Sequence, residues 1–263
     1  MSSSVSNWLR ILLLILSIFS FRPQLHRLHQ IGDSTGVSLA YLLCNVISAT
    51  EQLTISCYMF NAQSSDPFVH NPPNAGDWLN FLQFAVTWSL SSTLFLFGVF
   101  YSPARLGRKA FIADITFLSL SLLAAILYVL ANLCGANYRS QDWEYSIFLG
   151  SHLIFVNPVV TLLAIAALPA QLRELKRHGH AALSLTGLAS QAVIFAMLGL
   201  SWVYRARLDY NLSDVFRTWG SFTSWYQLVG WAAVDHLVFA VVQGILFLVV
   251  LGRKRTVTVK RGE

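Results

Sequence analysis

Charged residues are scarce in this chain of 263 residues: only 11% are Asp, Glu, Lys or Arg. Soluble domains carry about 25% charged residues, so this chain has too little charge to cover the surface of a water-soluble globule. Hydrophobic residues make up 55% of the sequence, and the mean hydropathy is +0.56. The composition argues against a soluble enzyme, a disordered chain and a fibrous protein. It predicts an all-α polytopic membrane protein.

The chain also has few cysteines and no familiar motif of cofactor or metal chemistry. Its three cysteines, Cys44, Cys57 and Cys134, lack the spacing of a metal site, and we expect inert thiols. His26 and His29 have no third ligand near them in the sequence. No phosphate-binding glycine pattern, nucleophile elbow or zinc motif is present. We therefore expect no metal and no cofactor.

Seven apolar segments are long enough, or nearly so, to cross a bilayer. They span residues 7–21, 37–60, 78–101, 110–134, 151–168, 181–204 and 221–251. Most of the 18 Lys and Arg residues fall in the connections on one side, which includes the basic tail 252–263. The positive-inside rule places that side in the cytosol and the N-terminus in the lumen, most plausibly of a vacuole, the ER or the Golgi. The net charge of +6 thus reflects topology, not a nucleic-acid partner.

One glycosylation sequon is present. Asn211-Leu212-Ser213 lies in the connection between the sixth and seventh segments. The predicted topology places Asn211 on the lumenal side, where it would be glycosylated.

The sequence contains an internal repeat. A shift of 146 residues brings Pro23 onto Pro169, Ser38 onto Ser184 and Asn45 onto Gln191. An even number of segments separates the copies, so the repeats are parallel. We expect a three-helix bundle in residues 1–101, a linking helix in 110–134 and a second three-helix bundle in 151–251. Each proline either ends its helix at the cytosolic interface or forms a hinge at the cytosolic mouth.

The first copy resembles a known family. Pro23-Gln24, followed by Gly36-Val37-Ser38-Leu39, is similar to the PQ-loop repeat of cystinosin and the SWEET sugar carriers. The second copy is divergent, with Pro169-Ala170-Gln171 and with Ala182 in place of the glycine. The resemblance implies seven helices, a lumenal N-terminus and transport of a small solute, with Pro23, Gln24 and Pro169 at the hinges.

Two acids lie where the bilayer would be. Glu51 falls in the middle of the second segment and Asp235 in the middle of the seventh. A charged side chain inserted at this depth costs at least about 2.5–3.5 kcal/mol of free energy, so the presence of each acid needs an explanation. We expect either that they exchange a coupling proton or that each forms a hydrogen bond that locks two helices together.

Amides accompany these acids. Asn45, Gln52 and Gln191 lie within apolar segments, where they either bind a solute or hold helices together. Asn157 precedes Pro158, which interrupts the fifth segment and frees a backbone carbonyl for a solute or a neighbouring helix. These four amides are the predicted substrate-binding residues.

Three functions fit these features. The sequence favours the first, a carrier or exporter of a small polar solute, proton-coupled through Glu51 or Asp235. The alternative is an integral-membrane enzyme, because small seven-helix cyclases of prenylated metabolites are similar in having one acid in the second helix and one in the last. There the acids would protonate an epoxide or alkene, and aromatic rings would stabilise the cation. A lumenal receptor built on Arg205, Arg207 and Arg217 is the third. In each case the partners are the lipid bilayer and a small molecule.

Overall fold

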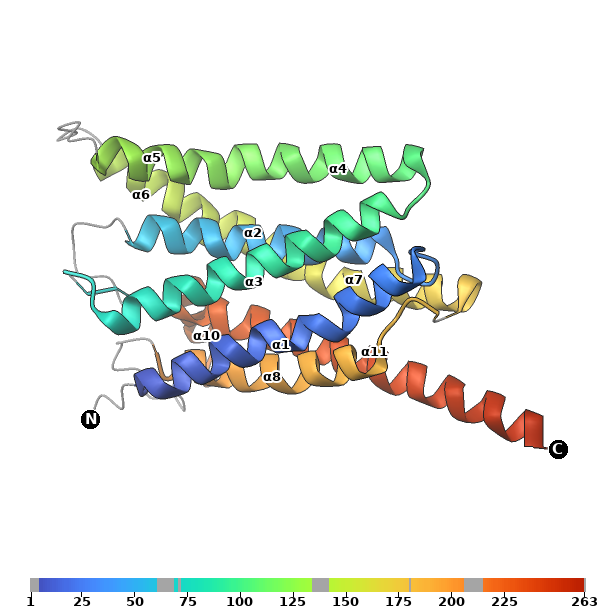
Figure 1. The fold of residues 1–263 in the computed structure, drawn as a ribbon. Helices are drawn as coiled ribbons and strands as arrows, with labels where there is room; N and C mark the ends of the chain where they lie inside the picture. Colours follow the sequence, from blue (N-terminus) through green and yellow to red (C-terminus); the bar gives the residue numbers. More distant parts are fainter. Residues whose placement is uncertain are drawn as a thin grey trace.

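The structure is a computed structural model, and it describes residues 5–60, 69–70, 72–133, 142–179, 181–205 and 215–262. These residues form long, roughly parallel helices, and no strand occurs among them (Figure 1). Four helices are uninterrupted: α1 (Asn7–Ile31), α2 (Leu39–Phe60), α3 (Ala75–Phe100) and α8 (Leu185–Val203). α1 begins at one end of the bundle and α11 ends at the other (Figure 1).

Three further helical segments each contain one π-helical turn. They are α4–η1–α5 (Ala104–Leu118, Ser119–Leu123, Ala124–Leu133), α6–η2–α7 (Asp142–Ser151, His152–Val156, Asn157–His178) and α10–η3–α11 (Trp219–Trp225, Tyr226–Gly230, Trp231–Gly262). Turns of this kind break the regular hydrogen-bond ladder and often occur at functional sites. The turn η2 directly precedes Asn157 and Pro158, where the sequence predicts an interruption.

Six of the seven helical segments in the described part of the chain are long and apolar enough to cross a membrane. Their outer faces expose large apolar side chains such as Leu120, Phe155 and Leu162. Exposed side chains of this kind suit contact with lipid rather than water. The chain is therefore a multi-pass helical membrane protein.

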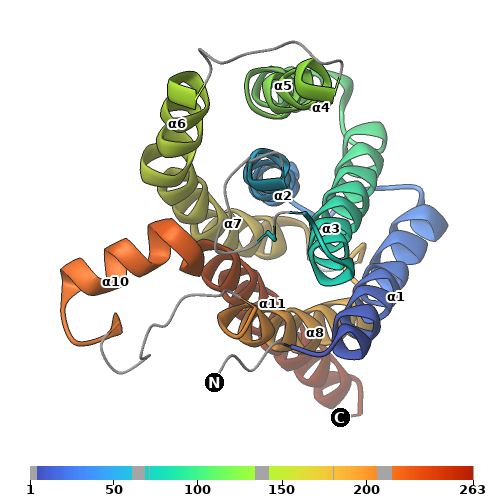
Figure 2. The same cartoon turned by 90° about the vertical axis from the view of Figure 1, so that its left-hand side faces the viewer.

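The remaining segment, α2, is not one of these six, and it lies in the centre of the bundle (Figure 2). The surrounding helices α3, α4, α5, α7 and α11 separate it from the bilayer (Figure 2). Every residue from Ser48 to Met59 is buried, and this stretch includes Glu51 and Gln52. Protein, not lipid, surrounds this helix, so its polar side chains can find hydrogen-bond partners.

The two prolines of the repeat do not end their helices. α1 continues through Pro23 to Ile31, and α7 continues through Pro169 to His178. The prediction that each helix terminates at its proline is therefore wrong, and the hinge stays a prediction. α1 ends instead at Gly32, whose φ of 65° is left-handed and whose N–H donates to the carbonyl of Leu28. A proline removes only one backbone donor, so the remaining ladder continues beyond it.

Two glutamines connect these helices to the starts of α2 and α8. Gln24 donates from Nε2 to the carbonyl of Ala182 (2.9 Å) and accepts at Oε1 from the N–H of Ser184 (2.7 Å). Gln171 donates from Nε2 to the carbonyl of Gly36 (2.8 Å) and accepts from the N–H of Ser38 (2.8 Å). Both side chains are buried, and each satisfies backbone groups that a helix start leaves unpaired.

Candidate functional site

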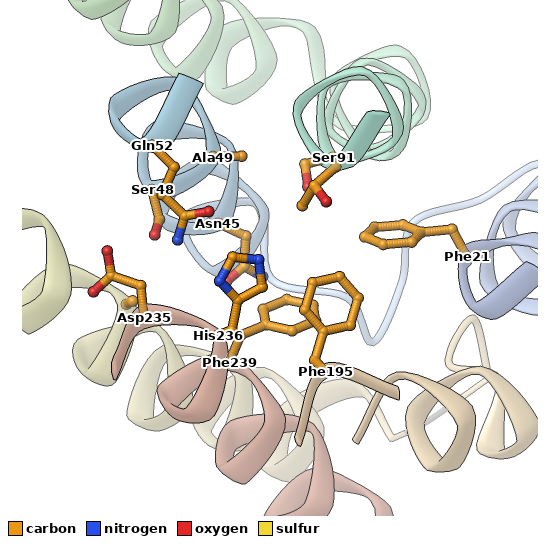
Figure 3. Close-up of a pocket in the computed structure, with 12 residues that line it drawn as sticks. Phe21, Asn45, Ser48, Ala49, Gln52, Ser91, Phe195, Asp235, His236 and Phe239 are labelled. Atoms are coloured by element: carbon orange, nitrogen blue, oxygen red, sulfur yellow. The ribbon is translucent and has the colours of Figure 1, made fainter. Parts of the chain in front are cut away.

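A buried pocket lies between α1, α2, α3, α7, α8 and α11, and we call it the central pocket (Figure 3). Its volume of about 20 Å³ has room for one or two water molecules in this conformation. It is lined by Phe21, Asn45, Ser48, Ala49, Gln52, Thr87, Ser91, Ala164, Phe195, Asp235, His236 and Phe239. An organic substrate could enter only if these side chains moved apart.

The central pocket has a polar side and an aromatic side (Figure 3). Asp235 lies on the polar side with Ser48 and Gln52, while Phe21 and Phe195 lie on the opposite side. The ring of His236 stands between them and packs against Phe195, with ring centroids 5.7 Å apart. The pocket therefore suits a molecule with a hydrocarbon part and a polar reacting group.

A chain of hydrogen bonds ends at Asp235. The amide nitrogen of Asn157 donates to the hydroxyl oxygen of Tyr226 (2.7 Å), which lies 2.6 Å from the hydroxyl oxygen of Thr161. The Thr161 hydroxyl in turn contacts Oδ1 of Asp235 at 2.5 Å. Asn157 and Thr161 lie four residues apart on one face of α7, and Tyr226 is the first residue of the π turn η3.

The chemistry of these groups sets the direction of the chain. The amide nitrogen of Asn157 donates to the Tyr226 oxygen. Because the single proton of Thr161 goes to Asp235, Tyr226 is the donor in its contact with Thr161. Thr161 then donates its single proton to Oδ1 of Asp235. Oδ2 has no hydrogen-bond partner among the described residues, and a proton on this carboxyl group would reside there.

One ring nitrogen of His236 forms a hydrogen bond, and the other has no partner among the described residues. Its Nδ1 lies 2.5 Å from the carbonyl oxygen of Ala232, which can only accept, so Nδ1 carries the proton. The buried Nε2 has no partner within the described part of the chain, and in the neutral ring it holds a lone pair. The central pocket therefore contains both an acid group and a basic nitrogen.

Glu51 lies outside the lining of the central pocket and pairs with a histidine. Its Oε1 is 2.7 Å from Nδ1 of His152, on the π turn η2, and both side chains are buried. The other oxygen, Oε2, has no partner among the described residues. Glu51 directly precedes Gln52, which lines the central pocket.

The other predicted binding residues divide into two groups. Asn45 and Gln52 line the central pocket, and Gln52 lies close to the Asp235 carboxyl group (Figure 3). Asn157 joins the chain to Asp235, whereas Gln191 is buried in α8 without lining the pocket. Pro23, Gln24 and Pro169 also lie outside the pocket lining, and Asn211 falls outside the described residues.

No family model, curated protein or solved structure matches the chain. Within the residues that the structure describes, no group of three His, Cys, Asp or Glu side chains could hold a metal ion. The function is therefore inferred from the residues of the central pocket and their surroundings.

Proposed function

We propose that this chain is an integral-membrane enzyme that cyclises a lipophilic, prenylated substrate, with Asp235 as the acid. The observation that carries the proposal is the central pocket, in which Asp235 and His236 face a wall of phenylalanine rings (Figure 3). Aromatic faces attract cations, so Phe21, Phe195 and Phe239 can stabilise the positive charge that forms along a hydrocarbon chain.

The reaction begins and ends with a proton transfer. Asp235, in its protonated form, gives its proton to an epoxide oxygen while the carbon–oxygen bond breaks. The π electrons of a nearby alkene attack the resulting cation and form a new carbon–carbon bond. His236 then removes a proton from the carbon next to the final cation, which leaves an alkene. The substrate gains one proton and loses one, so the product is an isomer and no oxidant is consumed.

The surrounding polar groups hold the acid in place. Thr161 fixes Oδ1 of Asp235 as a hydrogen-bond acceptor, and the free Oδ2 is the oxygen that delivers the proton. Glu51 and His152 form a second buried acid–base pair. The cycle closes when the proton that His236 has taken up returns to Asp235.

The purified chain, in detergent or nanodiscs, should convert a prenyl epoxide into a cyclic isomer of the same mass. Asp235→Asn should lower the rate by about 10²–10⁴-fold, the usual contribution of a general acid. Asp33→Asn, which changes an exposed acid, should leave the rate unchanged. Unaltered conversion by Asp235→Asn, or no cyclised product across a panel of prenyl epoxides and polyenes, would count against the enzyme.

A proton-coupled carrier of a small polar solute is the second candidate. It is favoured by the paired bonds of Gln24 and Gln171, which fit the resemblance to PQ-loop transporters. Asn45 and Gln52 would bind the solute at the polar side of the central pocket, with Pro23 and Pro169 as hinges and Asp235 or Glu51 as proton carrier. Proteoliposomes loaded with a solute library should then show solute flux driven by a pH gradient, which an enzyme alone would not produce.

For either function we propose an endomembrane location with the N-terminus in the lumen and the C-terminus in the cytosol. The asymmetry of the Lys and Arg residues supports this orientation. It places the beginning of α1 and the end of α8 at the lumenal end of the bundle.

A further inference from the structure

Two arginines are buried at the end of the bundle where α1 begins. Arg10 lies in the first turns of α1, and Arg205 follows the end of α8. Their residues are only 8% and 4% exposed, and their charges are close enough to act on each other. Buried charges are normally paired, so two neighbouring buried cations require an explanation.

Arg205 is held in position but is not neutralised. Its NH1 donates to Oδ1 of Asn80 (3.1 Å), and its guanidinium carbon lies 4.6 Å from the ring centroid of Trp202. Its Nε and NH2 are buried without a hydrogen-bond partner among the described residues. Burial and the charge of Arg10 lower the pKa of Arg205 to about 9, so Arg205 remains charged at neutral pH.

Among the described residues, the acid whose charge acts on this pair is Asp77, and it is already engaged. Asp77 exerts a Coulomb attraction on Arg10, but Oδ2 of Asp77 accepts hydrogen bonds from the N–H groups of His70 and Asn74, both at 2.9 Å. The same carboxyl group also contacts Nδ1 of His70 at 2.9 Å. Within the described part of the chain, this single carboxylate, which also caps a helix and binds a histidine, leaves the two arginines with a surplus positive charge.

Arg205 stands against the wall of a second pocket. Asn80 and Trp202, the two residues that its guanidinium contacts, both line this pocket. Arg205 itself is not a lining residue. The remaining lining is mostly apolar, with Phe60, Phe81 and Phe84, and it also includes Asp77 and Ser56. The guanidinium therefore lies beside a cavity with mostly apolar walls. Its volume of about 20 Å³ is as small as that of the central pocket, so its side chains must move apart before a hydrocarbon chain can enter.

We propose that Arg205, with Arg10, binds an oxyanion, the carboxylate or phosphate group of an amphiphilic molecule whose apolar part enters the second pocket. The planar guanidinium presents two parallel N–H donors, Nε and one terminal nitrogen, and these match the two oxygens of such a group. On Arg205 the unpartnered nitrogens are Nε and NH2. An oxyanion here would satisfy both donors and offset the surplus charge. This site shares no lining residue with the central pocket and does not depend on the proposed reaction.

The test measures thermal unfolding of the purified chain in an uncharged detergent. The probes are sodium decanoate, inorganic phosphate and the uncharged alcohol decanol, all at matched ionic strength. Decanoate should raise the melting temperature, and decanol should not. Phosphate distinguishes the two sources of the oxyanion: stabilisation by both anions indicates a site for the free group, and stabilisation by decanoate alone indicates an amphiphile.

Three variants locate the effect. Arg205→Gln should weaken the apparent affinity for decanoate by about tenfold or more, as expected for the loss of charged hydrogen bonds. Arg217→Gln removes an exposed arginine near the same end and should bind as the wild type does. Gly76→Ala places a Cβ 2.5 Å from NH1 of Arg10, so it should displace that side chain and weaken binding while Arg205 is retained.

Three outcomes would overturn the site. The first is that neither anion stabilises the wild-type chain. The second is that decanol stabilises it as much as decanoate. The third is that decanoate binds Arg205→Gln as tightly as it binds the wild type. If Arg205→Gln does not fold, equally tight binding to Gly76→Ala has the same meaning.

Discussion

Gln24 and Gln171 make equivalent pairs of hydrogen bonds across the two repeats. Gln24, which follows Pro23, binds the start of α8, and Gln171, which lies two residues after Pro169, binds the start of α2. Gln24 binds the carbonyl of Ala182 and the N–H of Ser184, and Gln171 binds the carbonyl of Gly36 and the N–H of Ser38. The two targets are related by the 146-residue shift of the repeat. From this exchange we infer that the two halves pack around an approximate two-fold axis.

The first prediction concerns these glutamines. Gln24→Ala and Gln171→Ala should each lower the free energy of unfolding by about 1–3 kcal/mol, because each leaves a buried carbonyl and N–H without a partner. Equal losses would support equivalent roles in the two halves, and a loss at only one position would contradict them. Gln30→Ala, which changes an exposed glutamine of α1, serves as the control. Denaturant-induced unfolding in mixed micelles measures the difference.

The second prediction concerns Gly36, which lies in the turn before α2. Its φ is +91°, and a Cβ at this position would lie 2.7 Å from the carbonyl oxygen of Gly179. Gly36→Ala should therefore destabilise the fold by roughly 1–3 kcal/mol or more, through backbone strain and a clash with a main-chain atom. Gly252→Ala, where a Cβ would meet nothing within 4 Å, should have little effect on the same unfolding measurement. A tolerated Gly36→Ala would show that the contact with Gly179 relaxes freely.

The sequence was sufficient to predict the membrane class and the approximate positions of the helices, because apolar periodicity and length depend on local sequence alone. The sequence also placed α2 correctly, although α2 is not one of the six helices that are long and apolar enough to cross a membrane. It failed at Pro23 and Pro169, because helix continuation beyond a proline depends on the tertiary contacts of the next turns. The role of Gln171 could not be predicted from the sequence. Gln171 lies one residue beyond the position that the 146-residue shift pairs with Gln24, so the alignment hides the fact that the two side chains make equivalent hydrogen bonds.

The site was predicted only in part. Asp235, Gln52 and Asn45 stood out as polar residues within apolar segments, and all three line the central pocket. Thr161 and Tyr226 were missed, because hydroxyl and aromatic residues are common in membrane helices and only their contact with Asp235 distinguishes them. The spacing of Asn157 and Thr161, four residues apart on one helical face, was the available signal.

The third prediction tests the chain that ends at Asp235. Tyr226→Phe removes the hydroxyl that directs Thr161 toward Asp235, so Thr161 can turn its proton to the carbonyl of Asn157, which lies 3.1 Å away. The rate of cyclisation should fall by about tenfold, the effect of a single hydrogen bond, and its pH profile should shift. Tyr204→Phe, which changes an exposed tyrosine, should alter neither. A lower rate with an unchanged pH profile would indicate a merely structural role for Tyr226.

The fourth prediction addresses topology. If the connection between α8 and α10 is lumenal, Asn211 should be glycosylated when the chain is expressed in a eukaryotic host. Treatment with an N-glycosidase should then increase the electrophoretic mobility of the wild type and leave Asn211→Gln unchanged. A sequon engineered into the connection between α7 and α8 should stay unmodified. Modification of the engineered sequon would reverse the proposed orientation.

The last prediction separates the acid from the base. Asp235 acts before the cation forms and His236 acts after it, so their loss should have different consequences. Asp235→Asn should stop consumption of the substrate. His236→Gln keeps Asp235 and the aromatic side of the central pocket, so consumption should continue. Without the Nε2 lone pair, the cation would lose its proton elsewhere or capture water, and the products should change to alkene isomers or alcohols. Gas chromatography with mass spectrometry distinguishes these outcomes. An alcohol is heavier than the substrate by one water molecule, and alkene isomers, which share the mass of the normal product, differ from it in retention time. Unchanged products from His236→Gln would assign the final proton to another base, and Glu51 with His152 is the nearest alternative.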